Sequence, residues 1–118
     1  MLPVEHLVDL DVLADRLLPV IEEWKRTAFV GPLTWRDEGS GWPKPNTSDR
    51  SHVIVPESLG LRLRKHALDD EFEMVVWVGG WADVDYLLDG EIYAFCPEFR
   101  DVDGAHRAVI NEVTDFLA

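Results

Sequence analysis

The 118-residue sequence has few basic residues for its number of acidic ones. It contains 11 Lys and Arg residues and 23 Asp and Glu residues, which gives a net charge of −12 at pH 7. Because phosphate binding needs clustered Lys and Arg, this balance argues against a nucleic-acid surface, and the same field repels an anionic membrane. The charge favours encounter with a basic protein, although acidity can also serve solubility alone.

Cysteine and long apolar runs are also scarce. Cys96 is the only cysteine, which excludes an intramolecular disulfide, and its apolar run Ile92–Cys96 predicts a buried thiol. No segment has the length of a membrane span, and the N-terminus lacks the basic start and apolar core of a signal peptide. We therefore expect a cytoplasmic protein.

Motifs for catalysis or metal binding are missing as well. The sequence has no Gly-x-Ser-x-Gly elbow and no phosphate-binding loop, and its histidines are too far apart in sequence for a metal motif: His6, His52, His66 and His106. The run Asp101–Gly104 resembles a calcium loop, but its glycine comes too early, so we interpret it as a helix start. The sequence predicts a non-enzymatic protein with no catalytic residue, metal site or cofactor.

The chain has the size of one domain with one hydrophobic core, spanning residues 1–118. Apolar residues at helical spacing predict a helix from about Asp9 to Phe29, which Pro19 should kink or split, and a second helix from about Asp103 to Leu117. Between the first helix and the strands lies a Gly- and Pro-rich stretch at about 30–52. We expect it to be a loop, apart from a short strand option at Leu33–Trp35.

Strand periodicity begins after this loop. Alternating or continuous apolar residues predict strands at Val53–Val55, Leu59–His66, Phe72–Val78, Trp81–Leu88 and Glu91–Cys96. The third of these is so apolar that we expect burial on both of its faces.

The turns between the strands set the fold class. Gly79-Gly80 and Asp89-Gly90 each predict a two-residue hairpin. The sequence thus predicts an α+β domain with an N-terminal helix, an antiparallel β-meander of about four to five strands and a C-terminal helix. Both helices should pack on one face of the sheet.

Alternation along the Trp81–Leu88 strand places Trp81, Asp83 and Asp85 on one face. The two carboxylates lie about 7 Å apart along the strand. Such a pair can act as acid and base or hold a hard cation, but no third converging group is identifiable. We favour two solvated carboxylates that face Arg62 and Arg64 from a nearby strand.

Tryptophan is abundant, with five residues in the chain. Large aromatic residues are enriched at interface hot spots, so we predict binding contacts from Trp81, Asp83 and Asp85 on the open sheet face. The loop should add Trp35 and Trp42. The alternative for these two loop residues is that they cover an edge of the core.

The C-terminal half has a recognisable pattern. It contains VWVGGWADVD over residues 76–85, DGEIY over 89–93, PEF over 97–99 and a closing helix that ends in DFL. Over roughly residues 57–117 this pattern resembles the TriTu-type immunity proteins of bacterial polymorphic toxin systems. The resemblance implies stoichiometric inhibition of a cognate toxin by direct binding, with no chemistry of its own.

Three hypotheses for function follow. The first is an acidic protein-binding domain, an immunity protein in its sharpest form, with a basic protein partner such as a toxin. The second is a small-ligand-binding or enzymatic domain, with a closed pocket bordered by Trp35, Trp42 and the sheet. The third is a self-associating structural domain, a homodimer that buries its aromatic face.

Overall fold

A computed structural model describes residues 5–39, 45–66 and 69–118. Its two helices are α1 (Leu10–Trp24) and α2 (Val102–Leu117), and a short 3-10 helix covers Arg50–His52. The strands in the described ranges are β1 (Ala28–Val30), β2 (Thr34–Asp37), β3 (Asn46–Thr47), β4 (Pro56–Lys65), β5 (Glu71–Trp77), β6 (Trp81–Leu88) and β7 (Glu91–Phe95). The predicted α+β class is confirmed.

All of these strands join one antiparallel sheet in the order β3-β2-β4-β5-β6-β7, and β1 pairs separately with β4. The ten-residue β4 is long enough to take both partners along one edge. Its start pairs with β2, and its end at Leu63–Lys65 pairs with β1. The β4–β7 meander is confirmed. The sheet is larger than the predicted four to five strands, because β1 and β2 also pair with β4 and β3 pairs with β2.

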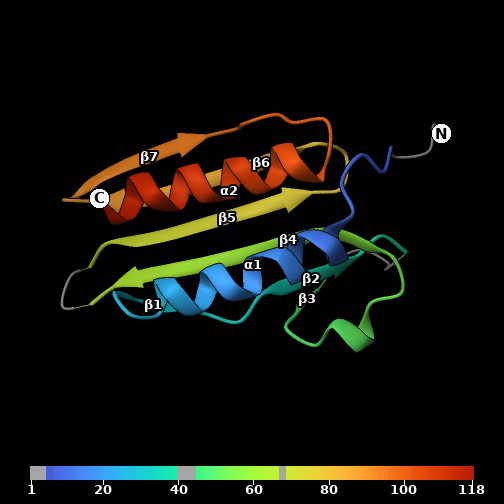
Figure 1. The fold of residues 1–118 in the computed structure, drawn as a ribbon, viewed down its shortest axis with the longest axis horizontal. Helices are drawn as coiled ribbons and strands as arrows, with labels where there is room; N and C mark the ends of the chain where they lie inside the picture. Colours follow the sequence, from blue (N-terminus) through green and yellow to red (C-terminus); the bar gives the residue numbers. More distant parts are fainter. Residues whose placement is uncertain (1–4, 40–44, 67–68) are drawn as a thin grey trace.

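Both helices lie on the same face of the sheet (Figure 1), as predicted. α1 packs on β1 and β4, α2 packs on β5 and β6, and the two helices contact each other. Every second strand residue is buried beneath them: Leu59, Leu61, Leu63, Phe72, Met74, Val76, Ala82 and Val84. These side chains form one core with the apolar stripes of the helices. Neither α1 nor α2 lies on the opposite face of the sheet.

Helix α1 is shorter than predicted, and Pro19 does not split it. Asp9 caps the start by accepting a hydrogen bond from the Val12 N–H at 3.1 Å, and the helix then runs unbroken to Trp24. Its buried stripe holds the helix against the sheet despite the donor that Pro19 lacks. Ala28 fits the helical spacing but is buried from strand β1 instead, where the β-forming residues that follow it pair with β4.

The stretch at 30–55 also differs from prediction. The expected loop contains β2, which overlaps the strand option at Leu33–Trp35, and also β3 and the 3-10 helix. The expected strand Val53–Val55 is irregular. The Asp37 side chain accepts the backbone N–H groups of Ile54 and Val55, at 2.9 and 3.4 Å, so these donors do not form a strand ladder.

Strand β5 is buried on one face only, contrary to prediction. Its buried positions alternate with half-buried Glu73, Val75 and Trp77, which lie on the face without helices. The turn that follows has three residues, not two, because Trp77 pairs with Trp81. The two-residue turn at Asp89-Gly90 is confirmed, and its positive φ angles of 52° and 80° identify a type I′ hairpin.

Candidate functional site: the open face of the sheet

The face of the sheet opposite the helices, here called the open face, carries outward side chains in rows set by the strand register. The row nearest the β5–β6 turn contains Arg36, Trp77 and Trp81. The following rows contain Asp83 beside Val75, then Arg62, Glu73 and Asp85. The last row crosses from β1 to β7 with Phe29, Arg64, Glu71, Leu87 and Ile92. The prediction that Trp81, Asp83 and Asp85 share this face is confirmed.

Two tryptophans form the aromatic part of the open face. The rings of Trp77 and Trp81 stack with centroids 6.0 Å apart and an interplanar angle of 19°. The guanidinium of Arg36 lies 5.5 Å from the Trp77 centroid, in cation–π contact. The Trp81 side is exposed, at 42% relative accessibility. This stack, here called the tryptophan pair, thus has a cation on one member and solvent on the other.

Asp83 fixes the tryptophan pair to the rest of the face. Its carboxylate accepts the Trp77 Nε1–H at 2.9 Å and lies 3.5 Å from the Cys96 thiol, which donates to it. Cys96 is exposed, so the predicted buried thiol is wrong. The hydrogen bond to Asp83 raises the pKa of the Cys96 thiol, because ionisation would place a thiolate beside a carboxylate.

The expected contact of Asp83 and Asp85 with arginines of a nearby strand is absent. Strand β5 lies between them, and its Glu73 takes the Arg62 guanidinium in an ion pair at 2.9 Å. Arg64 lies over the Phe29 ring, at 5.0 Å from its centroid. Asp85 is exposed directly opposite Glu73 in the register. Like charges directly opposite each other destabilise a sheet, so this arrangement favours an approaching cation.

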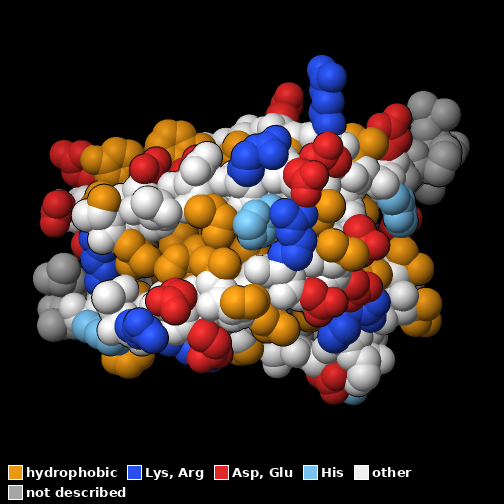
Figure 2. All heavy atoms as spheres, in the orientation of Figure 1, with side chains coloured by type: hydrophobic (Ala, Val, Ile, Leu, Met, Phe, Trp, Pro, Cys, Tyr) orange, Lys and Arg blue, Asp and Glu red, His pale blue; other side chains and the backbone are white. Residues whose placement is uncertain are grey.

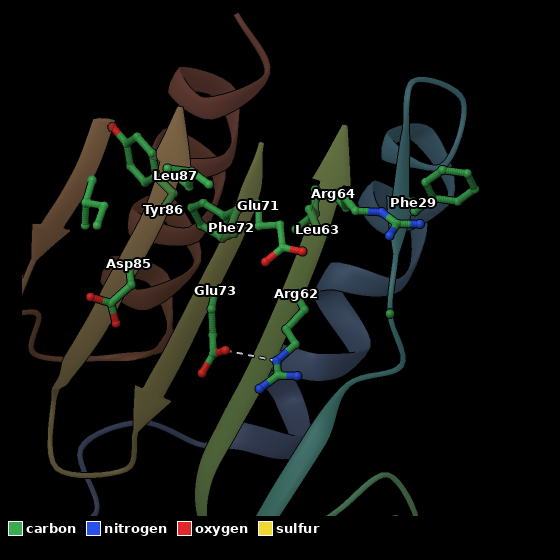
Figure 3. Close-up of a pocket in the computed structure, with 12 residues that line it drawn as sticks. Phe29, Arg62, Leu63, Arg64, Glu71, Phe72, Glu73, Asp85, Tyr86 and Leu87 are labelled. Atoms are coloured by element: carbon green, nitrogen blue, oxygen red, sulfur yellow. Dashed lines mark ion pairs between the residues drawn. The ribbon is translucent and has the colours of Figure 1, made fainter. Parts of the chain in front are cut away.

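A groove of about 540 Å³ crosses the end of the open face near β1 (Figure 3). Charged side chains lie along it, among them Arg62, Glu73 and Asp85, whose acidic and basic ends are visible in the figure. Apolar side chains flank them, from Phe29 on one side to Leu87 and Ile92 on the other. Its lining residues include no Ser, Cys, His or Lys, and its charged side chains offer pairing with both cations and anions.

Of the two loop tryptophans, Trp35 does not join this face. Trp35 pairs with Leu59 in the register and is buried on the helix side, with only 6% of its surface accessible. The Arg50 guanidinium lies 5.3 Å from its ring centroid. This is the core-covering alternative weighed for Trp35, and it removes that residue from the predicted contact surface. Trp42 lies outside the described residues.

Sequence reasoning missed three contributors to the open face: Phe29, Arg36 and Trp77. Trp77 was hidden because a two-residue turn was assumed, and only the three-residue turn places it directly opposite Trp81. Phe29 was assigned to a helix. The run Thr27–Val30 could have indicated a strand there, because its residues are mostly β-branched or aromatic.

Among the described residues, more than half of the Lys and Arg side chains have acidic partners. The ion pairs include Arg16–Asp103 between the helices, Lys25–Glu22, Arg26–Glu23, Arg50–Asp11, Arg62–Glu73 and Lys65–Asp70. On the helix side, Figure 2 shows charged side chains of both signs interspersed with apolar ones. The pairing of the basic residues leaves the acidic surplus as the source of the long-range field.

Comparison of the chain with family models, curated proteins and solved structures finds no match. Neither helix in the described ranges is long and apolar enough to cross a membrane. In the same ranges, no group of three or more His, Cys, Asp and Glu side chains is placed to hold a metal ion. The open face itself is therefore the basis for a functional assignment.

Proposed function

We propose that this chain is a protein-binding domain whose open face, around Trp81, Asp83 and Asp85, binds a basic protein. One observation carries the proposal: the tryptophan pair lies on a sheet face without helices, with Trp81 exposed beside two carboxylates. An exposed aromatic anchor with a charged rim is the usual composition of an interface hot spot.

The contact of Arg36 with Trp77 suggests how such a partner is recognised. A guanidinium already lies on one member of the tryptophan pair, so the exposed Trp81 can take an Arg or Lys of the partner in the same way. Asp85 lies on the same strand and face as Trp81 and supplies a counter-charge. A cation–π contact of this kind contributes about 0.5–1 kcal/mol when exposed and about 2 kcal/mol when desolvated.

The net charge supports the same class of partner. A surplus of 12 negative charges attracts a basic protein over several ångströms and speeds association. Because salt screens such attraction, binding should weaken as ionic strength rises.

The sharper form of the proposal is an immunity protein that neutralises a cognate toxin in the cytoplasm. It rests on the resemblance of residues 57–117, which cover β4–β7 and α2, and it needs no chemistry from this chain. Inhibition by direct binding requires only that the partner's own functional surface is covered.

The groove near β1 favours a second candidate, the binding of a small ligand. Its volume of about 540 Å³ falls in the range of ligand pockets, and its lining combines apolar walls with charged groups. In this form Trp35 does not contribute to a lid, because it packs on the helix side of the sheet. The candidate therefore concerns the groove alone.

Affinity capture from the native organism tests the proposed function with open-face variants. The tagged wild type, Trp81→Ala and Asp85→Asn serve as baits, and Asp15→Asn on the exposed side of α1 controls for the same change in charge. We expect one basic protein that the wild type and Asp15→Asn retain and the other two lose. Titration calorimetry with the purified partner should give the same order of affinities. A partner bound equally by all four baits contradicts the proposal.

Co-expression tests the immunity form. If the captured partner arrests growth when expressed alone, the wild-type chain should restore growth and Trp81→Ala should restore it less. A partner that is harmless alone rejects the immunity form and leaves the binding role intact.

A further inference from the structure

Strand β7 is the last strand of the sheet, and no strand in the described ranges pairs with its outer edge. In a two-residue hairpin the residues that flank the turn form a hydrogen-bonded pair, here Leu88 and Glu91. The alternation continues beyond the strand, since the Ala82 N–H donates to the Pro97 carbonyl at 3.0 Å. The odd-numbered residues of β7 therefore bond to β6. The N–H and C=O groups of Ile92 and Ala94 point away from the sheet.

Little protects this edge. α2 packs on β5 and β6, and β7 lies beyond it at the rim of the sheet (Figure 1). Ile92 is 82% accessible, and Ala94 and Phe95 are also exposed. Natural edge strands are usually guarded by Lys, Pro or a bulge, but the only charged residue of β7 is Glu91, whose carboxylate accepts the Tyr93 hydroxyl at 2.9 Å.

We propose that β7 pairs antiparallel with β7 of a second copy of this chain, which joins the two sheets across a two-fold axis at Tyr93. In this register Ile92 of each copy exchanges backbone hydrogen bonds with Ala94 of the other. The same register sets each large Ile92 beside a small Ala94 and each Glu91 beside a Phe95. The two carboxylates therefore do not meet, and the edge is complementary to itself, as a two-fold interface requires.

This association is separate from the proposed binding of a basic partner, and salt distinguishes the two. Each copy carries a charge of −12, so the copies repel each other at low ionic strength and the repulsion is screened by salt. Self-association should strengthen as salt is added, whereas binding of a basic protein should weaken. Either idea can therefore fail while the other stands.

Sedimentation equilibrium of the purified chain, over a range of concentrations and at low and high salt, tests the proposal. Ile92→Lys places an ammonium in the pairing edge, and Ile54→Lys makes the same change at a residue that is 86% accessible on the segment before β4. We expect a monomer–dimer equilibrium that Ile54→Lys leaves unchanged. Ile92→Lys should weaken it about tenfold or more, because an unpaired charge opposes burial at the edge.

Three results would overturn the proposal: a wild type that stays monomeric at all concentrations, equal effects of the two lysine variants, or a dimer that salt dissociates. Circular dichroism and the melting temperature of Ile92→Lys show whether the monomer keeps its fold. A variant that does not fold is replaced in the comparison by Ile92→Thr, which retains a β-branched side chain but removes apolar surface.

Disulfide trapping tests the register itself. Opposite residues of a non-hydrogen-bonded antiparallel pair have Cα atoms about 4.5 Å apart, within the span of a disulfide. Tyr93→Cys in a Cys96→Ser background should therefore cross-link on mild oxidation, whereas Ile54→Cys in the same background should not. Failure of Tyr93→Cys to cross-link in a sample shown to be dimeric rejects this pairing.

Discussion

The close approach of β2 to β4 can be tested by replacing Gly60 with alanine. A Cβ at Gly60 would lie 2.2 Å from Thr34 Oγ1, more than about 1 Å closer than an ordinary contact between heavy atoms. Gly60 is buried, so the added methyl group cannot turn toward solvent. Overpacking of this kind costs about 1–3 kcal/mol, of which the lower entropy of the unfolded chain offsets about 0.4–1 kcal/mol. We expect a net loss of about 1–2 kcal/mol in the free energy of unfolding.

The melting temperature converts this loss into a measurable shift. For 118 residues the unfolding entropy is about 0.25 kcal/mol per kelvin, so Gly60→Ala should melt about 4–8 °C below the wild type in calorimetry. Urea denaturation followed by tryptophan fluorescence gives the free energy independently.

A double-mutant cycle then isolates the contact. Thr34→Ala removes Oγ1 and leaves the Thr34 Cβ at 3.6 Å from the added methyl group, which is an ordinary contact. The double variant should therefore recover most of the loss, with a coupling of at least about 1 kcal/mol. If Gly60→Ala is as stable as the wild type, or if Thr34→Ala does not rescue it, the described approach of the two strands is wrong.

Three further predictions concern carboxylates. Asp83→Asn should speed alkylation of Cys96 by iodoacetamide near neutral pH, because loss of the carboxylate lowers the pKa of the thiol; an unchanged rate argues against their contact. The hydrogen bond from Arg50 lowers the pKa of Asp11 in the folded protein. The Arg50–Asp11 pair therefore stabilises the fold above pH 3.8, and this stabilisation is lost as the pH falls through the lowered pKa of Asp11. In urea denaturation at several pH values, Asp11→Asn should thus lose less unfolding free energy than the wild type below about pH 4. The difference should be under about 1 kcal/mol, because the ion pair is exposed. Asp70 is buried, and its carboxylate accepts the Asp89 N–H of the β6–β7 turn at 3.0 Å. Asp70→Ala should therefore lower the free energy of unfolding by about 1–3 kcal/mol, and a variant as stable as the wild type contradicts a stabilising role for this hydrogen bond.

The sequence predicted the parts of the fold that are determined by residues close together in the chain. The alternation of β6 and the Asp89-Gly90 turn depend on neighbouring residues, and both are confirmed. The end of α1 was missed because Ala28 continues the spacing of the helix while pairing with β4 decides its structure. In the expected loop, the strand option at Leu33–Trp35 overlaps β2, whose extent is decided by its pairing with the distant β4, and β3 was missed.

The candidate site was predictable in part. Alternation placed Trp81, Asp83 and Asp85 together, because successive strand residues point to opposite faces. It did not show that Trp77 stacks on Trp81 or that Trp35 faces the core, since both depend on pairing with other strands. Sequence alone left the choice between the open face and the core undecided for Trp35, and the register of β2 on β4 settles it.

The pairing of β1 and β2 with the same edge of β4 affects how the sheet unfolds locally. β5, β6 and β7 attach through neighbouring hairpins, whereas β1 and β2 reach β4 only after long chain segments close. Contacts between distant segments generally form late in folding, and they are natural sites for partial opening. Hydrogen exchange should therefore be faster for the amides of β1 and β2 than for the centre of β5. Release of these two strands would uncover Trp35 and remove Arg36 from Trp77, while Trp77 and Trp81 stay paired on β5 and β6. The tryptophan pair of the proposed binding surface would thus outlast the loss of one end of the sheet.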